Sequence, residues 1–214
     1  MPELKTGFHR ERIKGHHYTI NIPHRASQGE RVPLILMLHW GGPKFPWMGR
    51  GIMEDIGLPA FAEMQAIIVA PDRRRRHWAK PKAIEDIAWL VSYLEEHYPL
   101  DPRRRVVVGY SLGGIGVWYL LLKRPDLFPC GVAMAAPVPD HLDPADWKVP
   151  IYLINSTIDE DFPFPPNQER ANRFLEAGAP LEFHPLEDAA HTDVRKYIPS
   201  LTGSIAWIEQ NWDQ

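Results

Sequence analysis

A serine set among glycines directly follows a short apolar run near the middle of the chain. Residues 106–108 are all valine, Gly109-Tyr110-Ser111-Leu112-Gly113 comes next, and Gly114 stands behind it. Residues 112–123, a largely apolar stretch that ends before Pro125, predict a helix. A strand, a tight turn and a helix together hold a serine hydroxyl out of a sheet, where a base can take its proton. A pattern of this kind also occurs by chance in unrelated sequences. Between a predicted strand and a predicted helix, however, it predicts a nucleophile elbow with Ser111 as the nucleophile.

A serine activated in this way needs an acid and a histidine, which follow it along the chain on loops after later strands. The apolar run 149–154 predicts a buried parallel strand, and a loop with three adjacent carboxylates follows it. We assign Asp159 as the acid. Its neighbours Glu160 and Asp161 are the alternatives, and both are also typical of a solvated loop.

The histidine is predicted on the loop after the next strand. Residues 180–186 have a strand pattern, and the loop 187–193 presents His191 among small and acidic neighbours. His184 is the nearest rival, but it lies inside the strand pattern rather than after it. We therefore assign His191 as the base.

An acyl-transfer reaction also needs N–H donors for the oxyanion, and a loop near the start of the chain offers one. The apolar strand that begins at Pro33 ends in His39-Trp40-Gly41-Gly42-Pro43. We expect the backbone N–H groups of Trp40 and Leu112 to form the oxyanion hole. The ring of Trp40 has two alternatives, a wall of the acyl pocket or packing under the loop.

The remaining apolar pattern predicts a single domain over residues 1–214. Two alternating segments, 8–13 and 17–22, predict an antiparallel hairpin at the start of the sheet. Parallel strands are predicted at 34–39, 66–71, 105–110, 131–136, 150–155 and 181–186, with helices near 84–98, 112–123, 167–177 and 205–212. The fold class is therefore α/β, a doubly wound, mostly parallel, eight-stranded sheet with helices on both faces.

These motifs resemble the α/β-hydrolase superfamily over nearly the whole chain from about Ile20 onward. The stretch 98–114 is similar to the segment before the nucleophile in esterases of the feruloyl esterase and polyhydroxybutyrate depolymerase type, and small carboxylesterases and phospholipase-like enzymes share much of it. The resemblance implies ester hydrolysis through an acyl-enzyme, with no metal or organic cofactor. It does not fix the substrate, because one fold carries many chemistries. Trp40, where relatives commonly have glycine, and Asn155-Ser156, where many have His-Gly, depart from the pattern; the first leaves the shape of the pocket open.

The predicted pocket is open and lined by aromatic side chains. Many lipases insert a helical cap after the sixth strand, and only residues 137–148 fill that place here. Trp40, Trp47, Trp78 and Phe162 are the predicted substrate-binding residues, with Leu112 beside them, because they follow predicted strands. For each aromatic residue the alternative is core packing.

Composition limits the function classes further. The chain has 214 residues, 44% of them hydrophobic and 24% charged, with a formal net charge of -3, so we expect neither nucleic acid nor a membrane as a partner. A single cysteine, Cys130, and the lack of an apolar signal segment at the start favour a cytoplasmic location. The expected partner is a small-molecule ester, and association into a homo-oligomer is left open. The histidines His9, His16 and His17 lack the spacing of a metal site.

Two arginine runs stand out against this balance. Residues 103–105 are interpreted as a solvated face with local ion pairs. The same interpretation applies to Arg73–Arg76, but this run follows a predicted parallel strand, and such loops border the active-site edge of a sheet. A second hypothesis is therefore that Arg73–Arg76 flank the mouth of the site and favour substrates with an anionic group remote from the ester.

The sequence as a whole predicts a serine carboxylesterase that hydrolyses small or short-acyl esters. Thioester or peptide cleavage by the same residues is one alternative. A non-catalytic ligand-binding protein with the same fold is another, and proteins of that kind often lose a member of the triad.

Overall fold

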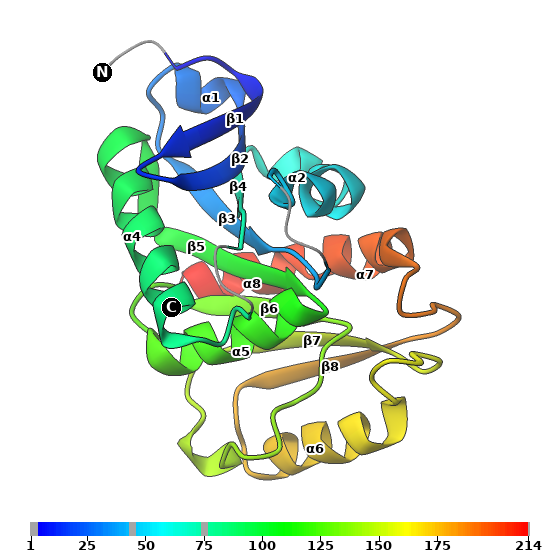
Figure 1. The fold of residues 1–214 in the computed structure, drawn as a ribbon. Coiled ribbons are helices and arrows are strands. Elements are labelled where there is room, and N and C mark those ends of the chain that lie inside the picture. Colours follow the sequence, from blue (N-terminus) through cyan, green and yellow to red (C-terminus); the bar gives the residue numbers. More distant parts are fainter. Residues whose placement is uncertain (1–3, 43–45, 74–76, 214) are drawn as a thin grey trace.

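The computed structural model describes residues 4–42, 46–73 and 77–213. Its centre is one eight-stranded sheet in the order β1-β2-β4-β3-β5-β6-β7-β8, drawn in Figure 1. The strands are β1 (Gly7–Ile13), β2 (His16–Ile22), β3 (Val32–Leu38), β4 (Ile67–Pro71), β5 (Leu100–Tyr110), β6 (Cys130–Met134), β7 (Ile151–Ser156) and β8 (Leu181–Leu186). Strands β1 and β2 pair antiparallel with each other, β2 pairs antiparallel with β4, and the other six strands are parallel. The predicted fold class is confirmed.

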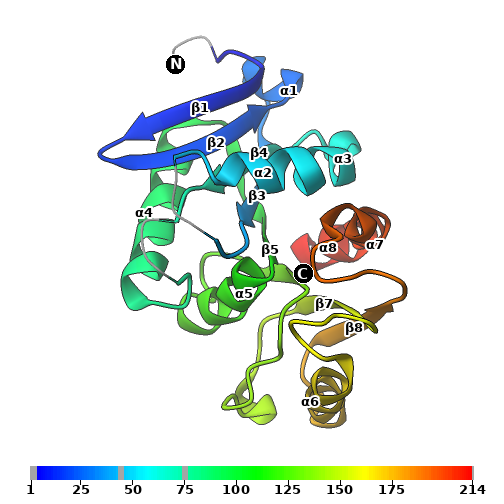
Figure 2. The same cartoon turned by 45° about the vertical axis from the view of Figure 1, so that its right-hand side comes forward.

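Helices cover both faces of this sheet. One face packs against α4 (Pro81–His97), α5 (Leu112–Lys123) and α6 (Phe164–Glu176), and the other against α2 (Gly49–Ile52), α3 (Leu58–Ala60), α7 (Ile198–Gly203) and α8 (Ile205–Trp212), as Figures 1 and 2 show. Short helical segments complete the chain: α1 (His24–Ser27), η1 (Met53–Gly57), η2 (Ala62–Met64), η3 (Pro144–Asp146) and η4 (Val194–Tyr197).

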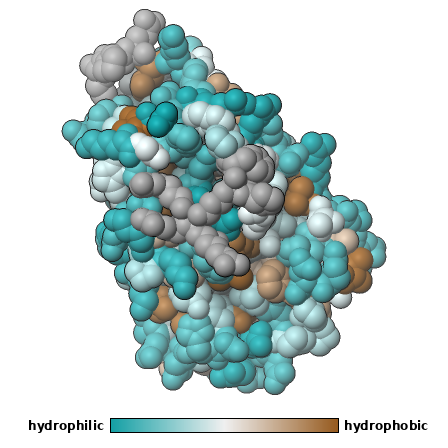
Figure 3. All heavy atoms as spheres, in the orientation of Figure 1, coloured by the Kyte–Doolittle hydropathy of each residue, from teal (hydrophilic) through white to brown (hydrophobic). Residues whose placement is uncertain are grey.

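Alternation along β3 explains the two cores. Leu34, Leu36 and Leu38 join the core under α4 and α5, whereas Ile35 and Met37 join the core under α2 and α8. All five side chains are buried. A strand that is apolar on both faces is expected where helices cover both sides of a parallel sheet. The face seen in Figure 3 is mostly hydrophilic, with small, scattered hydrophobic areas.

Some predicted boundaries are wrong. Helix α6 begins at Phe164 rather than near residue 167, because Pro165 lies in the first turn, where a helix needs no N–H donor. The strand predicted to end at residue 136 ends at Met134, and Ala135 has a positive φ of 46°. The helical segment over residues 49–64 was not predicted at all. Within the described residues, no helix is long and apolar enough to cross a membrane.

Candidate active site

Ser111 lies at the tip of the sharp turn between β5 and α5. Strand β5 ends at Tyr110 and α5 begins at Leu112, so the whole turn is one residue. The backbone of Ser111 has φ 54° and ψ -118°, and its N–H donates to the carbonyl of Met134 at 2.9 Å. A non-glycine residue at positive φ is strained, and such strain at a strand-to-helix turn is typical of an exposed nucleophile.

Two glycines allow the turn because a side chain would collide with backbone at either position. A Cβ on Gly109 would lie 2.3 Å from the carbonyl oxygen of Gly113. A Cβ on Gly113 would lie 1.8 Å from the carbonyl oxygen of Leu38 and 3.0 Å from that of His39. The start of α5 therefore lies directly against the end of β3, and the loop that follows β3 is held beside Ser111.

The structure brings Ser111, His191 and Asp159 together in hydrogen-bonding order. His191 Nε2 lies 2.9 Å from Ser111 Oγ, and His191 Nδ1 lies 2.9 and 3.0 Å from the two carboxylate oxygens of Asp159. Asp159 and His191 are buried, whereas Ser111 is half-buried. A carboxylate at Nδ1 places the imidazole proton there and leaves Nε2 free to accept the serine proton. The rival histidine, His184, instead stacks on Tyr152 with ring centroids 3.9 Å apart.

All three carboxylates of the loop after β7 contact His191, each at a different atom. Asp159 takes Nδ1, and it also accepts the backbone N–H groups of Asp161 and Phe162 at 3.0 and 2.8 Å. Glu160 accepts the backbone N–H of His191 at 2.8 Å, and this hydrogen bond lowers the pKa of its carboxyl group. Asp161 lies 3.5 Å from Nε2. Glu160 and Asp161 are exposed, as expected for loop residues, but neither is separate from the site.

Tyr110 supports His191 from below, a role that the sequence analysis missed. Its hydroxyl donates to the backbone carbonyl of His191 at 2.7 Å, and its side chain is buried. Burial raises the pKa of this phenol well above its usual range, so it stays a donor at every physiological pH. The available signal was its position inside the motif, one residue before the nucleophile.

A cavity of about 530 Å³ opens in front of Ser111 and His191. Trp40, Gly41 and Gly42 form one side of it, and Thr192 and Val194 lie on another. The ring of Trp40 meets that of Tyr110 edge-on, with centroids 6.2 Å apart, and it packs against Gly51. Trp40 therefore lines the cavity, and its ring packs against α2; which part of a substrate it meets stays a prediction.

His39 fixes the loop that carries Trp40, one of the two expected oxyanion donors. Its Nε2 accepts the backbone N–H of Arg73 at 3.2 Å, which assigns the ring proton to Nδ1, and Nδ1–H donates to the carbonyl of Trp40 at 2.7 Å. Trp78 donates its indole N–H to the carbonyl of His39 at 2.8 Å. Burial lowers the pKa of His39 to about 4, so the ring is neutral at pH 7.

We predict that His39 makes the protein less stable in mild acid. In the unfolded chain its pKa returns to about 6.5, so between pH 6.5 and pH 4 the unfolded state binds the additional proton. The contribution is fully present above pH 6.5 and is lost as the pH falls through this window, with a total of about 3 kcal/mol in the free energy of unfolding. Urea unfolding at pH 7 and pH 4.5 measures it. His39→Gln should show a smaller loss between the two pH values, and an equal loss would contradict the prediction.

Arg73 does not lie on a solvated face. Its side chain is buried, one of its terminal nitrogens donates to the carbonyl of Gly42 at 3.2 Å, and burial lowers the pKa of its guanidinium group. The interpretation of Arg73 as a surface residue is therefore wrong, because its side chain turns inward to hold the loop of His39. Arg74–Arg76 lie outside the described residues. In the second run, Arg105 pairs with Glu95 at 2.6 Å.

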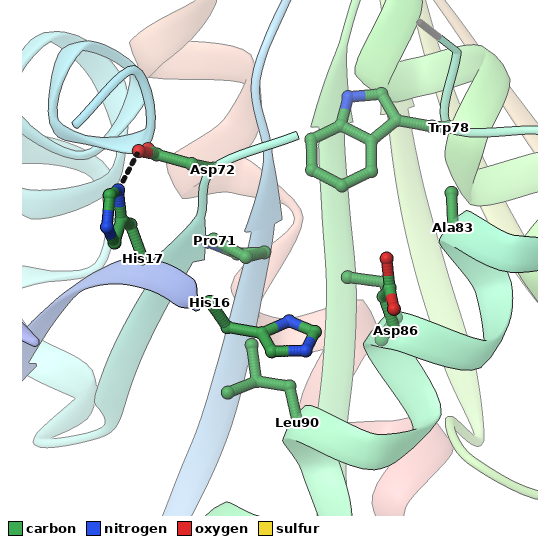
Figure 4. A pocket seen from close by; sticks show the side chains of 9 residues that line it. His16, His17, Pro71, Asp72, Trp78, Ala83, Asp86 and Leu90 are labelled. Atoms are coloured by element: carbon green, nitrogen blue, oxygen red, sulfur yellow. Dashed lines mark ion pairs between the residues drawn. The ribbon is translucent and has the colours of Figure 1, made fainter. Parts of the chain in front are cut away.

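Three of the aromatic residues expected in the pocket do not line the cavity of Ser111. Trp78 is buried and lines a separate, very small cavity of about 10 Å³ between β2 and α4. Figure 4 shows this cavity with His16, His17 and Asp72. Trp47 stacks on His17 with centroids 5.0 Å apart. Phe162 meets the ring of His191 edge-on at 5.3 Å and supports it from outside the cavity. Leu112 packs against Gly41 at the elbow.

Comparison with known proteins shows the family and the fold of the chain. The family model Esterase, described as "Putative esterase", matches residues 72–205. The protein named "Probable feruloyl esterase C" of Aspergillus terreus is 28% identical over 181 residues, which cover 82% of this chain and 66% of that protein. This chain thus spans just under two thirds of the length of the curated relatives it matches first. Among solved structures, a thermostable esterase superposes with a TM-score of 0.76 at 17% identity, covering 95% of this chain and 62% of that one. A ferulic acid esterase superposes with a TM-score of 0.70 at 20% identity, covering 97% and 98%. The structural likeness shows the α/β-hydrolase fold.

Proposed function

This chain belongs to the esterase family, and on that premise we propose that it is a serine carboxylesterase that hydrolyses small or short-acyl esters through an acyl-enzyme. The observation that carries the proposal is the hydrogen-bonded series Ser111, His191 and Asp159 at the wall of an open cavity. An activated serine requires a carboxylate beside its histidine and a turn that presents its hydroxyl. The buried Asp159 and the strained elbow meet both requirements.

In the proposed reaction Ser111 Oγ forms a bond to the ester carbonyl carbon while its proton moves to His191 Nε2. The carbonyl π electrons move to oxygen, and the N–H groups of Trp40 and Leu112 are proposed to stabilise that oxyanion. As the oxyanion collapses, the carbon–oxygen bond to the alcohol breaks and His191 gives its proton to the leaving oxygen. A water molecule then attacks the acyl-enzyme carbonyl carbon while His191 takes one of its protons. The bond from that carbon to Ser111 Oγ breaks, His191 returns the proton to Oγ, and the carboxylic acid leaves.

The size and lining of the cavity support small acyl groups. Its volume of about 530 Å³ lies in the range of small-molecule sites, and the described part of its lining leaves it open to solvent. Trp40 supplies aromatic surface beside Ser111. A short aliphatic or a single aromatic acyl group fits this lining, and an aromatic acid would agree with the names of the feruloyl esterase relatives.

The test is a series of nitrophenyl esters from acetyl to dodecanoyl, together with methyl ferulate and a matched thioester. We expect kcat/KM to be highest for acetyl to butanoyl or for the aromatic ester, and to fall for long chains. A strong preference for the thioester over its oxygen ester would show that the protein is a thioesterase rather than a carboxylesterase. No turnover of any substrate would favour the non-catalytic alternative.

We also propose a cytoplasmic location. Cys130 is the only cysteine of the 214-residue sequence, and it is buried and free. A reducing compartment is consistent with this cysteine usage, because no internal disulfide is available to stabilise the fold.

A further inference from the structure

Of the three carboxylates on the loop after β7, Asp161 alone lies next to His191 Nε2, the nitrogen that exchanges protons in the proposed reaction. Asp159 orients the His191 ring, and Glu160 holds its backbone. The Asp161 carboxylate instead lies 3.5 Å from His191 Nε2, lines the cavity of Ser111, and is 64% exposed. Asp161 contributes to the shape of the loop through its backbone, because its N–H donates to the Asp159 carboxylate. The side chain has no part in that hydrogen bond.

The position next to Nε2 determines which half of a substrate Asp161 would meet. In the proposed reaction Nε2 gives its proton to the leaving alcohol, so the alcohol oxygen must come within hydrogen-bonding distance of that atom. Trp40, the expected oxyanion donor, belongs to the loop after β3, a different part of the same cavity lining. Asp161 therefore borders the alcohol half of an ester rather than its acyl half.

The charge of Asp161 is not balanced by a cation in the cavity wall. Of the described residues that line the cavity, it is the only aspartate, glutamate, lysine or arginine. The nearest hollow, beyond Thr192 and Val194, contains Arg195 and Lys196, but these pair with Asp55 at 2.8 Å and with Asp193 at 2.9 Å. A substrate at the described wall would thus meet one negative charge.

We propose that Asp161 is a specificity residue that favours esters of cationic alcohols and disfavours esters of anionic ones. The inference rests on the proposed function and adds to it the charge of the leaving group. An ammonium group a few ångströms from an exposed carboxylate gains a modest interaction, about three- to tenfold in kcat/KM at low ionic strength. Salt should reduce the preference, because exposed charges are screened.

The experiment compares two acetate esters of the same shape. Acetylcholine, the acetate ester of choline, carries a quaternary ammonium group. The ester 3,3-dimethylbutyl acetate carries a neutral tert-butyl group in its place. We expect the charged ester to have the higher kcat/KM, about three- to tenfold in 10 mM salt, with a smaller ratio in 0.5 M salt. The ratio is internal to each variant, so a general loss of activity does not affect it.

Two variants of Asp161 and one control assign the preference. Asp161→Asn should bring the ratio to about 1, and Asp161→Lys should invert it. Glu187→Gln removes another exposed carboxylate, on the loop that precedes His191, and should leave the ratio as in the parent protein. A parent ratio of about 1, or an unchanged ratio in Asp161→Asn, would overturn the inference.

The two proposals fail in different ways. If neither ester is hydrolysed, or if Ser111→Ala hydrolyses both at the parent rate, the proposed function fails and its specificity with it. If hydrolysis depends on Ser111 while the ratio does not depend on residue 161, the function stands and only the inference about Asp161 is wrong.

Discussion

Replacing Ser111 by alanine is expected to lower kcat for ester hydrolysis by about four to six orders of magnitude. The substitution removes the only atom that forms a bond to the substrate in the proposed reaction. His191 would remain in place, because Asp159 still accepts from Nδ1 and the Tyr110 hydroxyl still donates to the His191 backbone carbonyl. The residual rate would reflect binding and the oxyanion donors alone. Single-turnover kinetics with a nitrophenyl ester measure the rate of acylation in the parent protein and its decrease in Ser111→Ala.

Unfolding of the same variant provides the control for folding. Ser111 has a φ of 54°, which alanine must also adopt, so Ser111→Ala should unfold at nearly the parent temperature. Ser111→Gly should be equally inactive but more stable than the alanine variant by about 1 kcal/mol, because glycine adopts a positive φ without strain. Hydrolysis at the parent rate in either variant would show that another residue is the nucleophile.

The elbow and the order of the triad could be predicted because both depend on local patterns and on one rule of parallel sheets. Loops after parallel strands meet at the same edge, so Asp159 after β7 and His191 after β8 come close although they are distant in sequence. The first glycine of the motif is required by the turn itself, because a Cβ on Gly109 would collide with the backbone of Gly113.

The directions of side chains could not be predicted in the same way. Trp78 and Trp47 follow a strand end or lie near one, yet Trp78 turns into the core to bind His39, and Trp47 stacks on His17. Arg73 likewise turns inward, which its place in a run of arginines does not indicate. Such choices depend on burial against distant residues rather than on local sequence.

The contacts of Glu160 and Asp161 show a further limit. In the sequence, both are alternatives to Asp159 or solvated carboxylates, and nothing in the local pattern distinguishes the three adjacent carboxylates. Only the backbone of the loop decides which carboxylate reaches Nδ1, because Asp159 is fixed there by the N–H groups of Asp161 and Phe162. The hydrogen bond of Glu160 to the His191 backbone joins two loops that are 31 residues apart.

Asp159→Asn is expected to lower kcat by about four orders of magnitude while leaving the fold intact. An asparagine has nearly the same shape as the aspartate and can still accept the N–H groups of Asp161 and Phe162 through its carbonyl oxygen. Its amide group would, however, favour the His191 tautomer that carries the proton on Nε2. That nitrogen could then no longer accept the proton of Ser111, which lies 2.9 Å away. The carboxylate that stabilises the imidazolium ion in the transition state would also be lost.

Glu160→Gln is the matched control, because it removes a neighbouring negative charge but keeps an oxygen to accept the His191 backbone N–H. We expect kcat to fall by less than about tenfold, since this oxygen holds the loop and does not touch the imidazole ring. Both kcat values are measured on one nitrophenyl ester at pH 8. Their difference separates the acid of the triad from a carboxylate that only holds the backbone of His191. Equal losses in the two variants would show that the charge of the loop, and not the contact at Nδ1, activates His191.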